Sequence, residues 1–120
     1  MNEVSTAVRD NLPLIELIIN NHVLGIVRQR QTLFYEKRYS STVLNDGVDY
    51  VKMAEAMGAT GFRATSKEGF TEVFAKALDM KTPVVIDCVI NCDDKVWPMV
   101  APGAPISDCF DDKDIEKKGM

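Results

Sequence analysis

Histidine, tryptophan and cysteine are scarce in this sequence of 120 residues, which holds one, one and three of them respectively. His22 is the only histidine, and Cys88, Cys92 and Cys109 lack the paired C-x-x-C spacing of a metal site, so no zinc centre is expected. An odd number of cysteines in such a chain instead predicts reduced thiols, which are typical of a cytoplasmic protein.

Long apolar runs and an excess of basic residues are also missing. No run of about 18 apolar residues occurs, so no membrane span is expected. Residues 1–6 lack the basic start and apolar core of a signal peptide, so the expected location is the cytoplasm. The net charge of −4 argues against non-specific binding of nucleic acid. The length and the hydrophobic content of 46% are those of one ordinary globular domain.

Strands alternate with helices along the first 90 residues. Two short aliphatic runs, 14–19 and 83–90, are bounded by proline or asparagine, which indicates strands buried on both faces of a parallel sheet. Glu16 is the exception, because a carboxylate in such a strand needs a rim position, a cation or a partner. Helices are expected over 2–10, 26–36, 50–57 and 66–78, with Asp49 as the N-cap of the third and Ser66 at the start of the fourth. A short strand is expected at 62–64. This alternation predicts an α/β fold with three layers, α-β-α, and a mostly parallel sheet.

The C-terminal residues have a different composition from the rest of the chain. Residues 93–120 hold three prolines and then a stretch rich in aspartate and lysine. We expect this segment to be an extended tail that frays at its acidic end. The chain therefore divides into a domain at 1–92 and a tail at 93–120.

Two adjacent asparagines, Asn20 and Asn21, follow the first predicted strand, and a helix is predicted to begin after Gly25. Ligands of open α/β sheets bind beyond the carboxyl ends of the strands, and a helix N-terminus attracts anions. An asparagine oxygen is a hard neutral ligand suited to Mg²⁺, which commonly bridges protein and phosphate oxygens. The segment is a candidate magnesium-diphosphate site, and the alternative is that the two asparagines form an ordinary strand-to-helix turn.

Other polar pairs also have two interpretations. Arg28 and Arg30 follow the turn on the predicted helix, where they could hold a keto-acid carboxylate or form a solvated helix face. Asp93 and Asp94 could be a metal pair or a solvated turn after the last strand, and no other ligand lies nearby in the sequence.

The residues around Asn20 and Asn21 closely resemble the large, catalytic subunit of acetolactate synthase. The similarity runs along nearly the whole chain in one register, which makes it more specific than any single motif. It implies that 1–92 are the C-terminal part of a thiamine-diphosphate-binding domain and that 93–120 are its tail. The matching segments are Asn20-Asn-His-Val-Leu-Gly-Ile-Val-Arg-Gln-Arg-Gln31, Leu33-Phe-Tyr-Glu-Lys-Arg-Tyr-Ser40, Asp49-Tyr-Val-Lys-Met-Ala-Glu-Ala-Met-Gly58, Pro83-Val-Val-Ile-Asp87 and Trp97-Pro-Met-Val-Ala-Pro-Gly-Ala104.

The resemblance implies a cofactor and a reaction. The family binds thiamine diphosphate through Mg²⁺, decarboxylates pyruvate and joins the two-carbon fragment to a second 2-keto acid in branched-chain amino acid biosynthesis. Its FAD-binding middle domain has no counterpart in these residues. Its Gly-Asp-Gly motif, whose aspartate is another magnesium ligand, and its catalytic glutamate have no match either, so we expect a fragment that is inactive alone.

The same resemblance assigns roles to single residues. Asn21 is expected to bind Mg²⁺ through its side chain, and Val23 through its backbone carbonyl. Gly25 and Ile26 match the turn beneath the thiazolium and pyrimidine rings of the cofactor. Arg30 stands where the family usually has tryptophan at the mouth of the substrate channel, which makes it the predicted substrate residue. The implied cofactor-binding segment comprises Asn21, His22, Val23, Leu24, Gly25 and Ile26.

An alternative of a different class is a non-catalytic assembly module, or one part of a split thiamine-diphosphate enzyme. In the family the strand at 14–19 pairs with an upstream strand, so its edge is expected to be a template for association. The expected partners are the keto acid, the cofactor, and a second copy or the rest of the enzyme, without nucleic acid or membrane.

Overall fold

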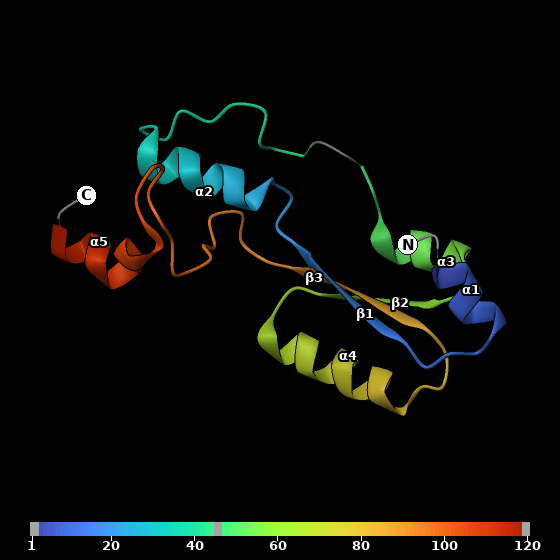
Figure 1. Cartoon of the computed structure of the whole chain (residues 1–120). Coiled ribbons are helices and arrows are strands. Elements are labelled where there is room, and N and C mark those ends of the chain that lie inside the picture. The colour runs from blue at the N-terminus through green and yellow to red at the C-terminus, as the bar shows by residue number, and fades with distance from the viewer. Residues whose placement is uncertain (1–2, 45–46, 119–120) are drawn as a thin grey trace. The chain divides into compact units, whose positions relative to one another are not determined.

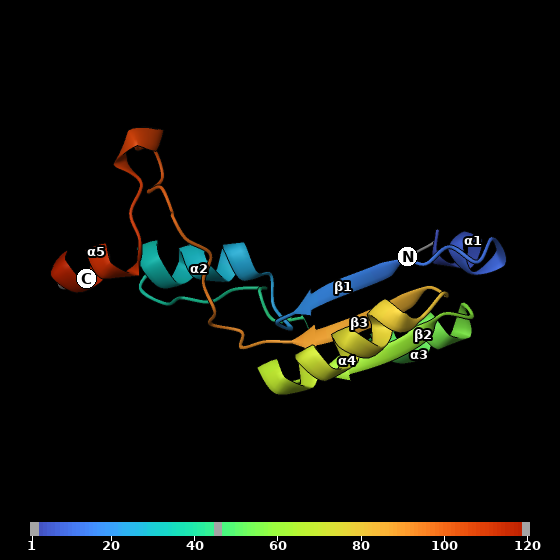
Figure 2. The ribbon, with the colours of Figure 1, turned by 90° about the horizontal axis from the view of Figure 1, so that it is seen from below.

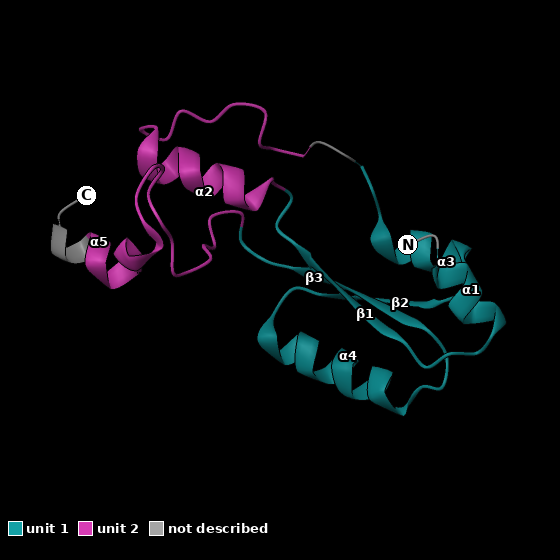
Figure 3. Cartoon of the chain, in the orientation of Figure 1, with its two compact units in different colours: residues 1–22, 45–91 teal, residues 23–44, 92–120 magenta. Residues whose placement is uncertain are grey.

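The structure is a computed structural model that describes residues 3–44 and 47–118, with side chains described as far as Ile115. It divides into two compact units (Figure 3). The first unit comprises 1–22 and 45–91, and the second comprises 23–44 and 92–120.

The first unit is built on a parallel sheet of three strands in the order β1–β3–β2 (Figure 1). The strands are β1 at Ile15–Asn20, β2 at Thr60–Ala64 and β3 at Val84–Val89. The residues of β3 from Val84 to Cys88 are buried because this strand lies in the centre and pairs on both sides. The parallel α/β fold and the three predicted strands are therefore confirmed, although β2 begins two residues before the predicted start at 62.

Three helices of this unit cover the two faces of the sheet: α1 at Val4–Arg9, α3 at Tyr50–Ala56 and α4 at Lys67–Asp79. Figure 2 shows α4 running along β2 and β3, which are the strands it contacts. Separate hydrophobic clusters fill the two faces, so the three-layer arrangement is also confirmed. The cluster on the α4 face contains Ala64, Ala77, Val84, Ile86 and Cys88, and the cluster on the α1 and α3 face contains Val4, Ala54, Ala59 and Val85.

Two helices start where side-chain caps are predicted. The Asp49 carboxylate accepts a hydrogen bond from the Lys52 backbone N–H at 3.3 Å, and the Ser66 hydroxyl accepts one from Gly69 at 3.0 Å. Each contact satisfies a backbone donor that the first helical turn leaves without an internal partner. The polar residues before α3 and α4 thus set where both helices begin.

The strand β1 is predicted to be buried on both faces, and this prediction is wrong. It is an edge strand whose Leu17 and Ile19 are 42% and 63% exposed. These residues point to the face that α4 covers, but α4 packs on β2 and β3. Glu16 is only partly buried, which agrees with a rim position.

The second unit contains α2 at Gly25–Phe34, a short 3-10 turn at Ile106–Asp108 and α5 at Asp112–Lys118. The tail is irregular from 93 to 105, but α5 lies in a segment for which no helix is predicted. Asp111 explains the helix, since its carboxylate accepts hydrogen bonds from the backbone N–H groups of Lys113 and Asp114 at 2.9 and 3.2 Å. This is an N-cap signal within an acidic stretch that otherwise favours fraying.

Candidate functional site

The predicted cofactor segment crosses the boundary between the two units. Asn21 and His22 belong to the first unit, whereas the residues from Val23 to Ile26 belong to the second. β1 ends at Asn20, and the backbone then turns through His22, whose φ of 56° is left-handed. Asn21 is partly exposed and His22 is exposed at this strand end. The structure therefore places the predicted magnesium ligand Asn21 in a turn beyond the carboxyl end of a parallel strand, where α/β proteins bind ligands.

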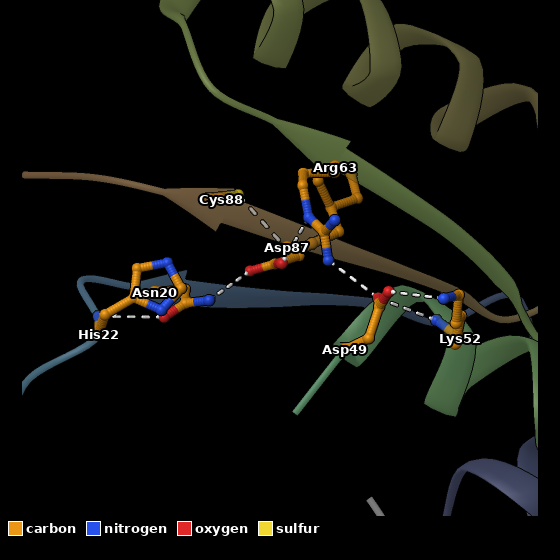
Figure 4. Close-up of polar contacts among 8 residues, drawn as sticks. Asn20, His22, Asp49, Lys52, Arg63, Asp87 and Cys88 are labelled. Atoms are coloured by element: carbon orange, nitrogen blue, oxygen red, sulfur yellow. Dashed lines mark hydrogen bonds and ion pairs between the residues drawn. The ribbon is translucent and has the colours of Figure 1, made fainter. Parts of the chain in front are cut away.

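The Asn20 side chain makes two hydrogen bonds at this turn. Its side chain is buried, and its Nδ2 donates a hydrogen bond to Asp87 Oδ1 at 3.0 Å. Its Oδ1 accepts a hydrogen bond from the backbone N–H of His22 at 3.1 Å (Figure 4). Both ends of the Asn20 amide are therefore engaged within the protein.

Asp87 is a buried carboxylate that sequence reasoning does not single out. It lies in the central strand β3, and its side chain is 2% exposed. Arg63 of β2, its partner in register, donates from Nε to Asp87 Oδ2 at 3.0 Å and from Nη2 to Asp49 Oδ1 at 2.9 Å. The hydrogen bond to Asp87 raises the pKa of Arg63. The pKa of Asp49 is lowered, first by the Lys52 backbone N–H and further by Arg63.

The part of the predicted segment in the second unit leads into α2. Val23 is buried and forms an antiparallel bridge with Val43, and the Leu24 N–H donates to the Thr42 carbonyl at 2.8 Å. No side-chain hydrogen bond caps the start of α2, where Leu24 is the N-cap residue. Leu24 and Ile26 are 45% and 54% exposed. The segment thus offers an uncapped helix N-terminus beside exposed apolar side chains.

The arginines of α2 have different environments. Arg28 is 15% exposed, and its Nε donates to Asp93 at 2.8 Å, while its guanidinium lies 4.1 Å from the centre of the Tyr39 ring. The hydrogen bond from Arg28 lowers the pKa of Asp93. Arg28 and Asp93 therefore form an internal ion pair, whereas Arg30 is exposed. Across 3–44 and 47–115, no three His, Cys, Asp or Glu side chains lie close enough together to hold a metal ion.

A cavity of about 560 Å³ lies within the second unit, and the residues that line it include none of the predicted site residues. Phe34, Trp97 and Phe110 line this cavity. The ring centre of Phe110 lies 6.2 Å from that of Phe34 and 6.0 Å from that of Trp97. The charged residues of the cavity include Lys37 and Lys95. Asp93 and Asp94, for which the sequence analysis gives two interpretations, a metal pair or a solvated turn, also line this cavity.

Comparison with known proteins identifies relatives of the chain. The family described as "Thiamine pyrophosphate enzyme, C-terminal TPP binding domain" matches residues 1–88. Acetolactate synthase of Mycobacterium avium is 44% identical over 107 residues, which are 84% of this chain and 17% of the relative. The large subunit of acetolactate synthase isozyme 2 of Escherichia coli K12 is 35% identical over 111 residues, 92% of this chain and 20% of the relative.

A solved structure has a similar fold. The thiamine diphosphate-dependent 4-hydroxybenzoylformate decarboxylase of Rhodococcus jostii RHA1 superposes with a TM-score of 0.65 at 26% identity. The match covers 73% of this chain and 16% of that protein. The chain thus spans a fifth or less of the length of the proteins it matches. No helix in the described part of the chain is long and apolar enough to cross a membrane.

Proposed function

Because this chain belongs to the family of thiamine pyrophosphate enzymes, through their C-terminal cofactor-binding domain, we propose that it supplies part of an acetolactate synthase-type cofactor site. The observation that carries the proposal is the turn at Asn21, which follows a parallel strand and precedes a helix without a side-chain cap. A strand end of this kind supports ligand binding, and an uncapped helix start suits a diphosphate.

We propose that Asn21 and Val23 hold Mg²⁺ through the side-chain oxygen and the backbone carbonyl. Two neutral oxygens suit Mg²⁺ but make only part of its octahedral set, so the diphosphate, water and a carboxylate from outside these residues would complete it. Exposed Leu24 and Ile26 would pack against the flat rings of the cofactor, beside Gly25 and His22. The bound cofactor supplies carbanion stabilisation, and the protein supplies position and electrostatics.

The proposed reaction is the condensation of pyruvate with a second 2-keto acid in branched-chain amino acid biosynthesis. Arg30, exposed on α2, is the proposed substrate residue, because a guanidinium pairs well with a carboxylate. These 120 residues contain no Gly-Asp-Gly motif and no match to the family's catalytic glutamate, so we expect no turnover from them alone. FAD, a cytoplasmic location and an oligomeric state stay predictions.

An NMR titration tests the cofactor proposal. The ¹⁵N-labelled chain is titrated with thiamine diphosphate and Mg²⁺, with the diphosphate alone, and with thiamine plus Mg²⁺. We expect shifts confined to residues 20–26 that need both diphosphate and metal, at ligand concentrations of about 1 mM. Asn21→Ala should abolish these shifts, and Asn21→Asp should keep them because it retains the oxygen ligand. Unchanged spectra for the unmodified chain would contradict the proposal.

The edge strand favours a second candidate function, a part that associates with another polypeptide. β1 pairs with β3 on one side, and its Leu17 and Ile19 are exposed. An unpaired edge with apolar side chains is a template for another strand. Analytical ultracentrifugation should show self-association at micromolar concentration that Ile19→Lys reduces, whereas a clean monomer would count against this candidate.

A further inference from the structure

A buried charge in the central strand of the first unit needs an explanation. Asp87 lies among Val85, Ile86 and Cys88, and its side chain is 2% exposed. A carboxylate buried in a sheet destabilises the fold unless it is paired and hydrogen-bonded, and an apolar residue would pack here without that cost. Arg63 and Asn20 provide the pairing, at 3.0 Å each.

The direction of the Asn20 amide follows from the chemistry of Asp87. An ionised carboxylate can only accept hydrogen bonds, so the Asn20 group that faces it must be the NH₂ group. The Asn20 oxygen then faces away from Asp87 and accepts the His22 backbone N–H at 3.1 Å. Arg63 donates directly to the second carboxylate oxygen, so both oxygens of Asp87 accept hydrogen bonds from side chains of the protein.

The His22 contact closes a turn around Asn21. A side-chain oxygen that accepts the N–H two residues later forms an Asx turn, which fixes the backbone of the residue between. That middle residue is Asn21, and the next residue, His22, has a left-handed φ of 56°. Figure 4 shows the contacts running from Arg63 through Asp87 and Asn20 to His22.

We propose that Asp87 is a positioning residue for the cofactor turn. It holds the Asn20 amide in one orientation and thereby sets the backbone from which Asn21 presents its side chain. This inference rests on the proposed function only for the role of Asn21, since the link from Asp87 to His22 is a property of the protein itself.

Hydrogen exchange of the full chain tests the link without any ligand. Asp87→Asn has the same shape but can donate as well as accept, so the Asn20 amide is free to reverse and turn its NH₂ group towards the His22 N–H. We expect the His22 amide to exchange about five- to tenfold faster, which is the change expected from the loss of one ordinary hydrogen bond. The amides of Ile18 and Val85 in the same unit should change less.

A double variant that swaps the side chains of Asn20 and Asp87 is the control for this experiment. Asn20→Asp combined with Asp87→Asn places the acceptor-only carboxylate at position 20 and an amide at position 87. The His22 N–H again has a fixed acceptor, and the amide at position 87 can accept from Arg63 and donate to position 20. We expect the double variant to restore most of the His22 protection, whereas Asn20→Asp alone places two carboxylates together and should be the least stable.

Variants at the surface keep the test informative if a core variant fails to fold. Arg63→Gln should also raise His22 exchange, because it removes one of the two side chains that hold the Asp87 carboxylate in place. Asp49→Asn is the matched control, since it weakens the contacts of Asp49 with Arg63 and Lys52 but leaves the side chains of Asp87 and Asn20 in place, so the His22 amide should change no more than the other amides of the sheet. Unchanged His22 exchange in folded Asp87→Asn, or equal acceleration of every amide of the sheet, would overturn the inference.

The cofactor titration separates this inference from the proposed function. Suppose that the unmodified chain shows Mg²⁺-dependent shifts at Asn21. Asp87→Asn should then raise the ligand concentration at the midpoint of the titration at least about threefold, which corresponds to the loss of half to one hydrogen bond. An unchanged midpoint would overturn the positioning role and leave the proposed function intact. Absent shifts in the unmodified chain would overturn the proposed function and the cofactor role of Asp87 together, while the exchange data would still decide the link to His22.

Discussion

Gln29 holds the backbone of Val96 with both ends of its side-chain amide. Its Nε2 donates to the Val96 carbonyl at 2.9 Å, and its Oε1 accepts from the Val96 N–H at 2.9 Å. Gln29 is 4% exposed, and Nε2 also lies 3.1 Å from the sulfur of Met99. Within the second unit, this side chain holds the Val96 segment of the tail on α2.

Removal of the Gln29 side chain should loosen the tail at Val96. Gln29→Ala removes two hydrogen bonds from the backbone of Val96, and each ordinary hydrogen bond contributes roughly 0.5–1.5 kcal/mol. Hydrogen exchange should show faster exchange at the Val96 amide and little change in the sheet of the first unit. Arg30→Ala, on the exposed side of the same helix, is the control, and full protection of Val96 in Gln29→Ala would contradict the assignment.

Gly61 should not tolerate a side chain. A Cβ at this position would lie 2.8 Å from the carbonyl oxygen of Val51, because α3 presses against β2 here. Gly61→Ala must push the helix backbone away and should destabilise the protein by about 1–3 kcal/mol in urea unfolding. Gly47→Ala meets no atom within 4 Å and is the matched control. Equal unfolding midpoints for the two variants would show that the contact is absent.

The Asp49 carboxylate should make stability depend on acid pH. Its pKa is lowered by the Lys52 N–H and by Arg63, so its contribution is present above the unfolded pKa of about 3.9. That contribution is lost as the pH falls through the lower folded pKa. Asp49→Asn should therefore be less stable than the unmodified protein at pH 7, with the difference shrinking towards about pH 3. Urea unfolding at several pH values measures this, with Glu55→Gln on the same helix as the control.

The three cysteines should react with thiol reagents at different rates. Cys88 is buried in the sheet, and burial together with the nearby Asp87 raises the pKa of its thiol. Cys109 is exposed. Since the thiolate is the reactive form, Cys109 should react with Ellman's reagent first and Cys88 last at pH 8. Loss of the slowest phase in Cys88→Ser would confirm the order, and loss of the fastest phase would contradict it.

Much of the first unit can be predicted from local patterns. Aliphatic runs bounded by proline and asparagine predict strands at 14–19 and 83–90, and the structure has them at 15–20 and 84–89. Asp49 and Ser66 predict the starts of two helices. These predictions succeed because period, caps and breakers act over a few residues. The exposure of Leu17 and Ile19 in β1 is not predictable in this way, because it depends on which strands α4 covers.

The sequence by itself determined the family, the order of strands and helices, and the segment at 20–26 as the candidate cofactor turn. Only the tertiary structure decided which side chains support that turn. Asn20 and Asp87 are 67 residues apart in the sequence, and Gln29 and Val96 are separated by the same distance. Contacts of this kind depend on how strands align in the sheet and how the tail packs on α2, and neither is encoded in local spacing. Parallel pairing places Arg63 opposite Asp87, and because the Asp87 carboxylate is buried it needs the arginine as its partner.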